Sequence, residues 1–336
     1  MAAERRHGQG TASGRRAAAG RPLAAPGIET RRLLSRLQLV VTRRLRGLVQ
    51  GEHLGLFPGP GTEPGESRVY VPGDDVRLID WNVTARTGEL HVCDPVADHE
   101  VDLWLLVDVS ASQHFGTSLR EKREVVVGLA AAFGLPATRL ANRVGAVVVG
   151  GGEVLTVPPA TGRKRLLALL RRVLATPAWE GEGRTDLAAA LGRLERLARR
   201  RSVVVVISDF LSTPGWEAAL GRLGTRHELV VAEVVDPREL ELPRMGILAL
   251  VDPETGRSRV VDTSRAGLRS AFARAAGTQR AAVATAVARA GADHLVVSTD
   301  ADWLGEALAF FARRTRRRAY RAAPSRTAPE RTGGPS

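Results

Sequence analysis

Short apolar runs alternate with amphipathic segments along the chain from about residue 99 onwards. The apolar runs, many of them β-branched, predict strands at 101–107, 144–149, 153–157, 202–207, 228–235 and 293–298. Apolar residues recurring three and four apart predict helices at 118–142, 162–175, 185–200, 214–223, 265–290 and 302–318. Residues 245–263 resemble an inserted hairpin. This alternation predicts a doubly wound α/β domain over residues 99–318, with a mostly parallel sheet flanked by helices.

The segment before this domain has a different pattern, and we assign residues 31–98 to an N-terminal helix plus a small β-rich element. Residues 31–50 place apolar side chains three and four apart with arginines between them, which predicts a helix. Its apolar stripe is interpreted as packing on the domain, and a helix lying on a membrane surface is the alternative. After a Gly/Pro-rich stretch, short strands are predicted at 67–71, 76–81 and 89–93.

The net charge of +13 is concentrated at the two ends of the 336 residues. Residues 1–50 carry +9 and residues 313–336 carry +7, which leaves −3 for the remainder. Residues 1–30 and 319–336 lack apolar periodicity and are predicted to be disordered basic tails. Such tails can bind nucleic acid or anionic lipid electrostatically. We favour the alternative that an arginine-rich chain with two lysines reflects GC-rich coding.

Several classes of protein are disfavoured by what the sequence lacks. No apolar run reaches the roughly 18–20 residues of a membrane-spanning helix, and no secretory signal is visible. Cys93 is the single cysteine, so an intrachain disulfide and a cysteine zinc cluster are excluded. Phosphate-binding loops, nucleophile elbows and zinc-protease helix motifs are missing. The lack of a membrane span and of a secretory signal, together with the single cysteine, predicts a cytoplasmic protein.

Oxygen-bearing side chains stand at the predicted ends of three elements. Two groups follow strands and one begins a helix, and in doubly wound sheets ligands bind beyond the carboxyl ends of strands. Mg²⁺ takes about six oxygen ligands, and carboxylates and hydroxyls supply them. The sequence therefore predicts a Mg²⁺ site, with Mn²⁺ or Ca²⁺ as alternatives, formed by Asp108, Ser110, Ser112, Thr185 and Asp209.

The charge of these ligands indicates what the site does. Two carboxylates roughly neutralise a divalent ion, whereas neutral hydroxyls leave it electrophilic. Such an ion favours an external carboxylate as its last ligand, which predicts a site that binds a partner protein. An enzyme would also need a general base. Asp186 and His114 are weak candidates, as a helix-cap residue and a solvated loop residue, so a metal-dependent hydrolase of phosphoesters or nucleic acid is the alternative function.

These motifs together resemble the von Willebrand factor A fold with an intact metal-ion-dependent adhesion motif. Upstream, the run from Arg68 to Arg86 resembles the signature of the bacterial family called domain of unknown function 58. The resemblance spans about residues 33–318. It implies a metal-dependent adaptor working with a MoxR-type AAA+ ATPase in protein maturation or assembly. Two departures are a glutamine, Gln113, where many members carry methionine, and no sign of the N-terminal membrane helices of some members.

The signature residues have a structural interpretation. Its charged side chains are expected to form buried or half-buried ion pairs that fasten the small β element to the α/β domain: Arg68, Asp74, Asp75, Arg77, Asp80 and Arg86. Trp81 is expected to anchor the core between the two parts. A binding surface and a second acidic metal site are the alternatives.

Overall fold

A six-stranded sheet forms the centre of the computed structural model, in the order β10-β7-β6-β3-β4-β5. All neighbours are parallel except β5, which pairs antiparallel with β4. The predicted doubly wound α/β sheet is therefore confirmed. The strands are β3 (Leu103–Asp108), β4 (Val144–Gly150), β5 (Glu153–Ala160), β6 (Val203–Ser208), β7 (Glu228–Val235) and β10 (Asp293–Ser298). The structure describes residues 34–37, 39–44, 67–93, 101–116, 120–150, 153–176 and 185–322.

The two central strands determine where functional side chains leave the sheet. Every residue of β3 and β6 is buried, as expected of parallel strands covered on both faces. Their register pairs Val107 with Ile207. The residues that follow, Asp108 and Ser208, therefore leave the sheet side by side at its carboxyl edge.

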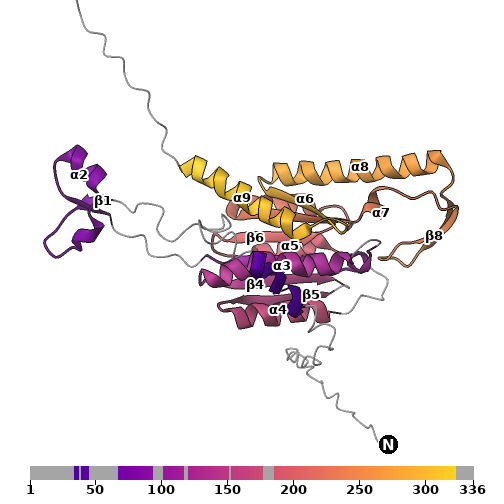
Figure 1. Cartoon of the computed structure of the whole chain (residues 1–336), viewed down its shortest axis with the longest axis horizontal. Coiled ribbons are helices and arrows are strands. Elements are labelled where there is room, and N and C mark those ends of the chain that lie inside the picture. The colour runs from indigo at the N-terminus through magenta and orange to yellow at the C-terminus, as the bar shows by residue number, and fades with distance from the viewer. Residues whose placement is uncertain are drawn as a thin grey trace, which may run out of the picture.

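Helices cover both faces of this sheet (Figure 1). One face carries α3 (Lys122–Arg139), α4 (Arg163–Ala175) and α9 (Trp303–Ala322), whose large core side chains include Phe133 and Phe311. The other face carries α5 (Leu187–Leu197), α6 (Trp216–Arg226) and α8 (Ala266–Arg289). The short helix α7 (Pro237–Leu240) leads into a separate hairpin of β8 (Ile247–Val251) and β9 (Ser258–Asp262), which confirms the predicted insert.

The described part of the predicted N-terminal helix is helical and packs on the α/β domain. Residues 34–37 and 39–44 are helical, and Leu34 and Val41 are buried in the core that includes α3 and α9. Arg44 donates to both carboxylate oxygens of Asp302, at 2.8 and 2.6 Å. These contacts favour the packed interpretation over a helix on a membrane surface.

The small element differs from its prediction in one of three strands. β1 (Ser67–Val69) pairs antiparallel with β2 (His91–Cys93). The prediction of a strand at residues 76–81 is wrong. Its place is taken by a 3₁₀ turn, η1 (Val76–Leu78), and a helix, α2 (Trp81–Thr87).

Aspartate caps explain this difference. The side chain of Asp75 accepts from the Arg77 amide, and that of Asp80 accepts from the amides of Asn82 and Val83. Such caps satisfy free N–H groups at a helix start and favour helix over strand. The two aspartates therefore act inside the element, in place of the predicted ion pairs to the α/β domain.

The other signature residues also require a correction. Arg68 donates two hydrogen bonds to Asp74, at 2.7 and 2.8 Å, so this ion pair is internal to the small element. Trp81 stands in the first turn of α2 with 68% of its surface exposed. The prediction that Trp81 anchors a core is therefore wrong.

Most of the two predicted tails lies outside the residues that the structure describes. α9 continues to Ala322, so the helix passes the expected boundary at 318. Residues 1–30 and 323–336 lie outside the described residues. Within the described residues, no helix is both long and apolar enough to cross a membrane.

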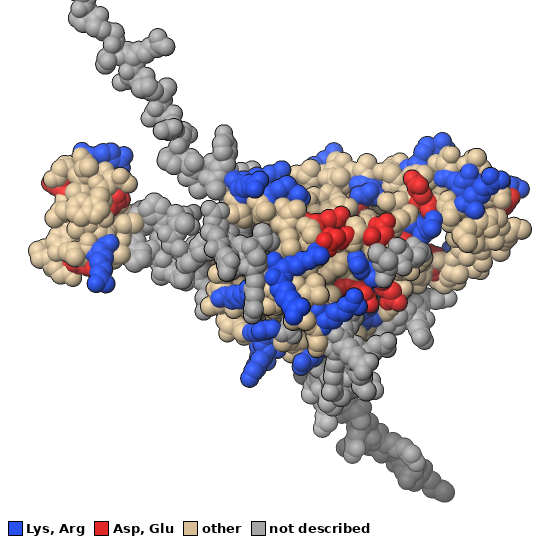
Figure 2. All heavy atoms as spheres, viewed as in Figure 1, with Lys and Arg blue, Asp and Glu red and all other residues tan. Residues whose placement is uncertain are grey.

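On the face shown in Figure 2, arginine and lysine side chains are interspersed with acidic ones.

Helix α6 offers a matched test of the packing between helices. A Cβ at Gly224 would lie 1.9 Å from the carbonyl oxygen of Ala290, whereas Gly221 in the same helix has no atom within 4 Å of that position. We expect Gly224→Ala to lower the free energy of unfolding by about 1–3 kcal/mol, because α6 must move away from the end of α8. Gly221→Ala should raise it by about 0.5–1 kcal/mol. Urea unfolding measures both, and equal effects would contradict this packing.

Candidate metal site

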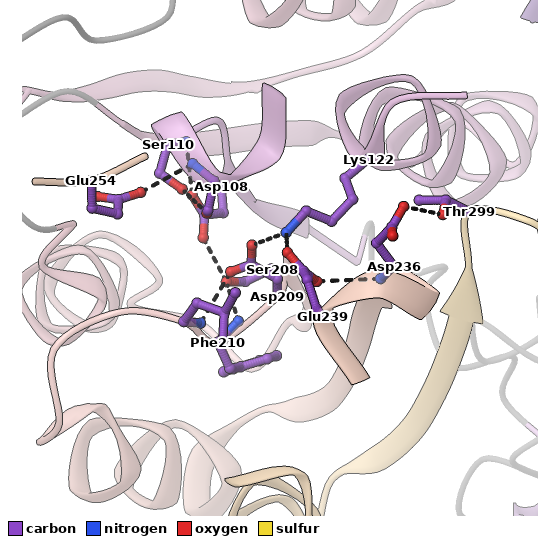
Figure 3. Close-up of polar contacts among 12 residues, drawn as sticks. Asp108, Ser110, Lys122, Ser208, Asp209, Phe210, Asp236, Glu239, Glu254 and Thr299 are labelled. Carbon is purple, nitrogen blue, oxygen red and sulfur yellow. Dashed lines mark hydrogen bonds and ion pairs between the residues drawn. The ribbon is translucent and has the colours of Figure 1, made fainter. Parts of the chain in front are cut away.

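The five predicted ligands lie together at the carboxyl edge of the sheet. Asp108 ends β3, Ser110 and Ser112 belong to the turn that follows, and Asp209 directly follows β6. Thr185 lies two residues before α5. Each of the five is at most 5% exposed, although serine, threonine and aspartate are usually surface residues. The structure thus places the predicted set, buried, at one edge of the sheet, and Figure 3 shows Asp108, Ser110 and Asp209 of this set.

Hydrogen bonds fix the first loop and join it to β6. One carboxylate oxygen of Asp108 accepts from the Ser110 amide at 2.9 Å, and the other accepts from the Ser208 hydroxyl at 2.6 Å. The hydroxyl oxygens of Ser110 and Ser112 lie 2.9 Å apart. Ser208 was missed by the sequence prediction, although it directly precedes Asp209.

The third loop is held in a strained conformation. Asp209 accepts from the Leu211 amide at 3.0 Å, and the Phe210 amide donates to the Ser208 hydroxyl at 3.0 Å. Phe210 has a φ of 56°, in the left-handed region that a bulky residue rarely adopts. Its ring is buried and packs against Trp216, with centroids 4.8 Å apart. Packing therefore stabilises a conformation that directs Asp209 into the site.

A glutamate from the β8–β9 turn contacts the other two loops. Glu254 accepts from the Ser112 amide at 3.2 Å through one carboxylate oxygen. Its other oxygen accepts from the Thr185 amide at 3.1 Å and the Thr185 hydroxyl at 3.2 Å. Sequence reasoning missed Glu254 because the hairpin is distant in the chain and its turn resembles an ordinary surface turn.

Two buried carboxylates at one edge create an electrostatic problem. Burial, and then the charge of Asp209, raise the pKa of Asp108 to about 7. A divalent cation relieves such repulsion between buried carboxylates. The acceptor capacity also fits a hard cation, because each carboxylate can accept about four hydrogen bonds or ligands. The Ser110 amide and the Ser208 hydroxyl occupy two of these acceptor positions on Asp108.

A buried lysine lies on the far side of Asp209. The ammonium of Lys122, at the start of α3, donates to Asp209 at 2.6 Å and also forms an ion pair with Glu239 of α7. Its side chain is fully buried. Burial lowers the pKa of Lys122, but the charges of Asp209 and Glu239 outweigh it and raise the pKa above its ordinary value. Lys122 is therefore a fixed cation beside the site.

The sequence carried a weak signal for this lysine. The chain has two lysines among its 49 basic residues. An ammonium is a compact point charge that fits between two carboxylates, whereas the planar guanidinium of arginine is larger. The other lysine, Lys164, is exposed at the start of α4, so a lysine alone does not mark a buried position, and the sequence could not name the partners of Lys122.

Helix α7 extends this network towards β10. Glu239 accepts from the Asp236 amide at 3.2 Å, as part of a capping box. Asp236 in turn accepts from the Thr299 hydroxyl at 2.7 Å, and both residues are fully buried. A chain of polar contacts thus connects Asp209 to the carboxyl end of the edge strand β10 (Figure 3).

The weak base candidates have structural contacts. Asp186 accepts from the Ala189 amide at 2.8 Å and caps α5, as predicted. His114 lies 2.7 Å from Arg123 and is half-buried, and burial lowers its pKa. Its expected solvated position is therefore corrected.

The strand order and the helices on both faces of the sheet define a von Willebrand factor A-like fold. Residues 66–282 match the family described as "Protein of unknown function DUF58". "Uncharacterized protein Rv1480" of Mycobacterium tuberculosis is 46% identical over 283 residues, covering 84% of this chain and 89% of that protein. "Uncharacterized protein Mb1516" of Mycobacterium bovis matches to the same extent. The chain therefore belongs to the DUF58 family.

Solved structures resemble the chain at low identity. BatB of Bacteroides thetaiotaomicron is 15% identical, covers 64% of this chain and 99% of its own, and has a TM-score of 0.39. An aerotolerance-related membrane protein of Bacteroides fragilis is 16% identical over 65% of this chain and 99% of its own, with a TM-score of 0.42. The strand order and helix layers described above define the fold here.

The buried lysine generates a stability prediction. Lys122→Met leaves Asp209 and Glu239 without their cation, so we expect the free energy of unfolding to fall by about 3–5 kcal/mol. Adding Glu239→Gln to Lys122→Met should recover part of this loss, because one uncompensated carboxylate is removed. Urea unfolding of the single and double variants in EDTA measures the coupling. Additive effects of the two substitutions would contradict the ion pair.

A second prediction concerns Gln113, which directly follows the candidate ligand Ser112. Gln113 is fully buried, and among the described residues its amide has no hydrogen-bond partner. A buried unpaired amide costs about 1–3 kcal/mol. Gln113→Met, similar in length, is therefore expected to raise the midpoint of thermal unfolding. Calorimetry measures this shift, and a lower midpoint would indicate that the amide has a partner.

Proposed function

We propose that this protein is a non-enzymatic, metal-dependent adaptor that binds a carboxylate of a partner protein. One observation carries the proposal: Asp108 and Asp209 lie buried at the same sheet edge, with three hydroxyl-bearing residues from the adjoining loops. Two charges and three neutral ligands suit a hard divalent cation such as Mg²⁺, with Mn²⁺ or Ca²⁺ as alternatives.

The residues have distinct roles in this proposal. Asp108 and Asp209 supply the negative charge that retains the cation. Ser110, Ser112 and Thr185 supply neutral oxygen ligands, directly or through water. When bound, the cation supplies an electrophilic position that an external carboxylate can fill. Lys122 limits the negative charge that Asp209 contributes, because its ammonium already neutralises part of that carboxylate.

The partner class comes from the family resemblance. Members of this family often occur beside MoxR-type AAA+ ATPases, so we propose that such an ATPase is the partner, in protein maturation or assembly. A machine that remodels proteins through ATP hydrolysis needs an adaptor that recognises clients. A metal-held carboxylate suits this role because the contact is specific for an acidic residue and reversible.

Metal-dependent hydrolysis of phosphoesters or nucleic acid is the rival function. It requires a base that faces a metal-activated water. Asp186 and His114 are engaged in the structural contacts described above. Phosphoester hydrolysis in Mn²⁺ by the wild type, abolished in Asp209→Ala, would overturn the adaptor proposal in favour of the hydrolase.

Calorimetric titration with Mg²⁺ tests the metal site. Asp108→Asn keeps the shape of the side chain but removes one of two repelling charges. We expect it to weaken Mg²⁺ binding by at least about tenfold and to leave the folded state intact. Glu241→Gln is the control, because Glu241 is an exposed carboxylate of the same domain. Equal Mg²⁺ affinity in the wild type and Asp108→Asn would contradict the proposed site.

The partner is tested separately. Binding of the purified MoxR-type ATPase to the immobilised wild type should require Mg²⁺, and it should be lost both in EDTA and in Asp108→Asn. Binding that persists in EDTA would show that the metal is not the point of contact.

A further inference from the structure

The carboxylate of Glu254 lies between the first and second of the three ligand loops. It accepts hydrogen bonds from Ser112 of the first loop and from Thr185 of the second. Both residues belong to the predicted ligand set. Figure 3 shows Glu254 pointing towards Asp108 and Ser110 from its own segment. A carboxylate of this chain thus lies beside the residues proposed to hold the cation.

The turn that carries Glu254 is preorganised. The side chain of Asp252 accepts from the Glu254 amide at 3.0 Å and from the Thr255 hydroxyl at 2.7 Å. The Gly256 amide donates to the Asp252 carbonyl at 2.8 Å, and Gly256 has a φ of 67°. Because the backbone is fixed in this way, little additional ordering is needed to hold the Glu254 carboxylate at the loops.

The strands of the β8–β9 hairpin are exposed, whereas its base and its tip are held by hydrogen bonds. Ile247, Val251 and Val260 are 75%, 61% and 74% exposed. At the base, the buried hydroxyl of Thr263 donates to the Gly246 carbonyl at 2.8 Å. The hairpin is therefore fastened at its base, exposed along its strands and attached through Glu254 at its tip. Elements with few buried apolar contacts are those that open at low free-energy cost.

We propose that Glu254 is an internal carboxylate ligand that closes the metal site, and that the partner's carboxylate must displace it. This inference rests on the proposed function, since it identifies what occupies the position that the partner would take. The β8–β9 hairpin is the moving part. When Glu254 leaves, the amides of Ser112 and Thr185 are free to receive the incoming carboxylate.

A tethered carboxylate competes through its local concentration. Short tethers give effective concentrations of the order of millimolar or higher. A free carboxylate can bind only to molecules from which Glu254 has moved away. Its apparent affinity is therefore reduced by the fraction of molecules in that open state. A partner that supplies further contacts overcomes this competition, whereas an isolated acidic side chain does not. The hairpin thus makes the site selective for a complete partner surface.

Mn²⁺ is the probe for this inference, because the water-proton relaxation of bound Mn²⁺ reports exchanging water on the ion. In Glu254→Ala, water takes the vacated position, so we expect higher relaxation per bound Mn²⁺ than in the wild type. Acetate should then suppress this excess at a concentration at least about tenfold lower than in the wild type. Glu241→Gln serves as the matched control and should behave as the wild type.

The outcomes separate this inference from the proposed function. If Asp108→Asn loses Mn²⁺ but Glu254→Ala matches the wild type in relaxation and acetate affinity, the internal ligand is wrong and the metal site stands. If the wild type and Asp108→Asn bind Mn²⁺ equally, both proposals are overturned. Should Glu254→Ala fail to fold, Glu254→Gln replaces it, because the amide oxygen keeps a hydrogen-bond acceptor but is a weaker ligand. Unchanged acetate affinity in Glu254→Gln would also overturn the inference.

Discussion

The burial of two carboxylates side by side is the constraint on which this end of the molecule depends. The in-register pairing of β3 and β6 puts Asp108 next to Ser208 and Asp209 at one edge of the sheet. Away from water, each carboxylate requires compensation. Lys122 compensates Asp209, and the Ser208 hydroxyl and Ser110 amide hydrogen-bond to Asp108. The start of α3, the strained Phe210 and helix α7 are all positioned around these contacts.

Most of the fold followed from periodicity because the central strands are apolar at nearly every position and helices such as α4, α5 and α6 bury one apolar face. The exceptions lie where local polar contacts outweigh that pattern. Residues 76–81 are mostly apolar, as in a short strand, but Asp75 and Asp80 cap helical turns there. Trp81 was expected in a core because it is large and apolar, yet it lies exposed on a short helix. Burial depends on tertiary packing, which a single short element does not reveal.

The part of the candidate site that could be predicted consists of residues at the ends of strands and helices. Asp108, Ser110, Ser112, Thr185 and Asp209 each flank a recognisable strand or helix, and parallel topology brings such ends together. Lys122, Glu239 and Glu254 belong to other elements and reach the site only through the tertiary fold. Their side chains alter its charge most, so the sequence alone indicates the candidate ligands and not their electrostatic surroundings.

The two groups that flank the site differ in how readily they can leave. Lys122 is enclosed between Asp209 and Glu239 at the start of a long core helix, so removing its charge would leave buried carboxylates uncompensated. Glu254 is attached by three hydrogen bonds from the tip of an exposed hairpin. An incoming carboxylate can replace those bonds one for one, but it cannot replace an internal ammonium. The proposed exchange at this edge therefore has a direction: the lysine side stays fixed, and the proposed partner approaches from the hairpin side.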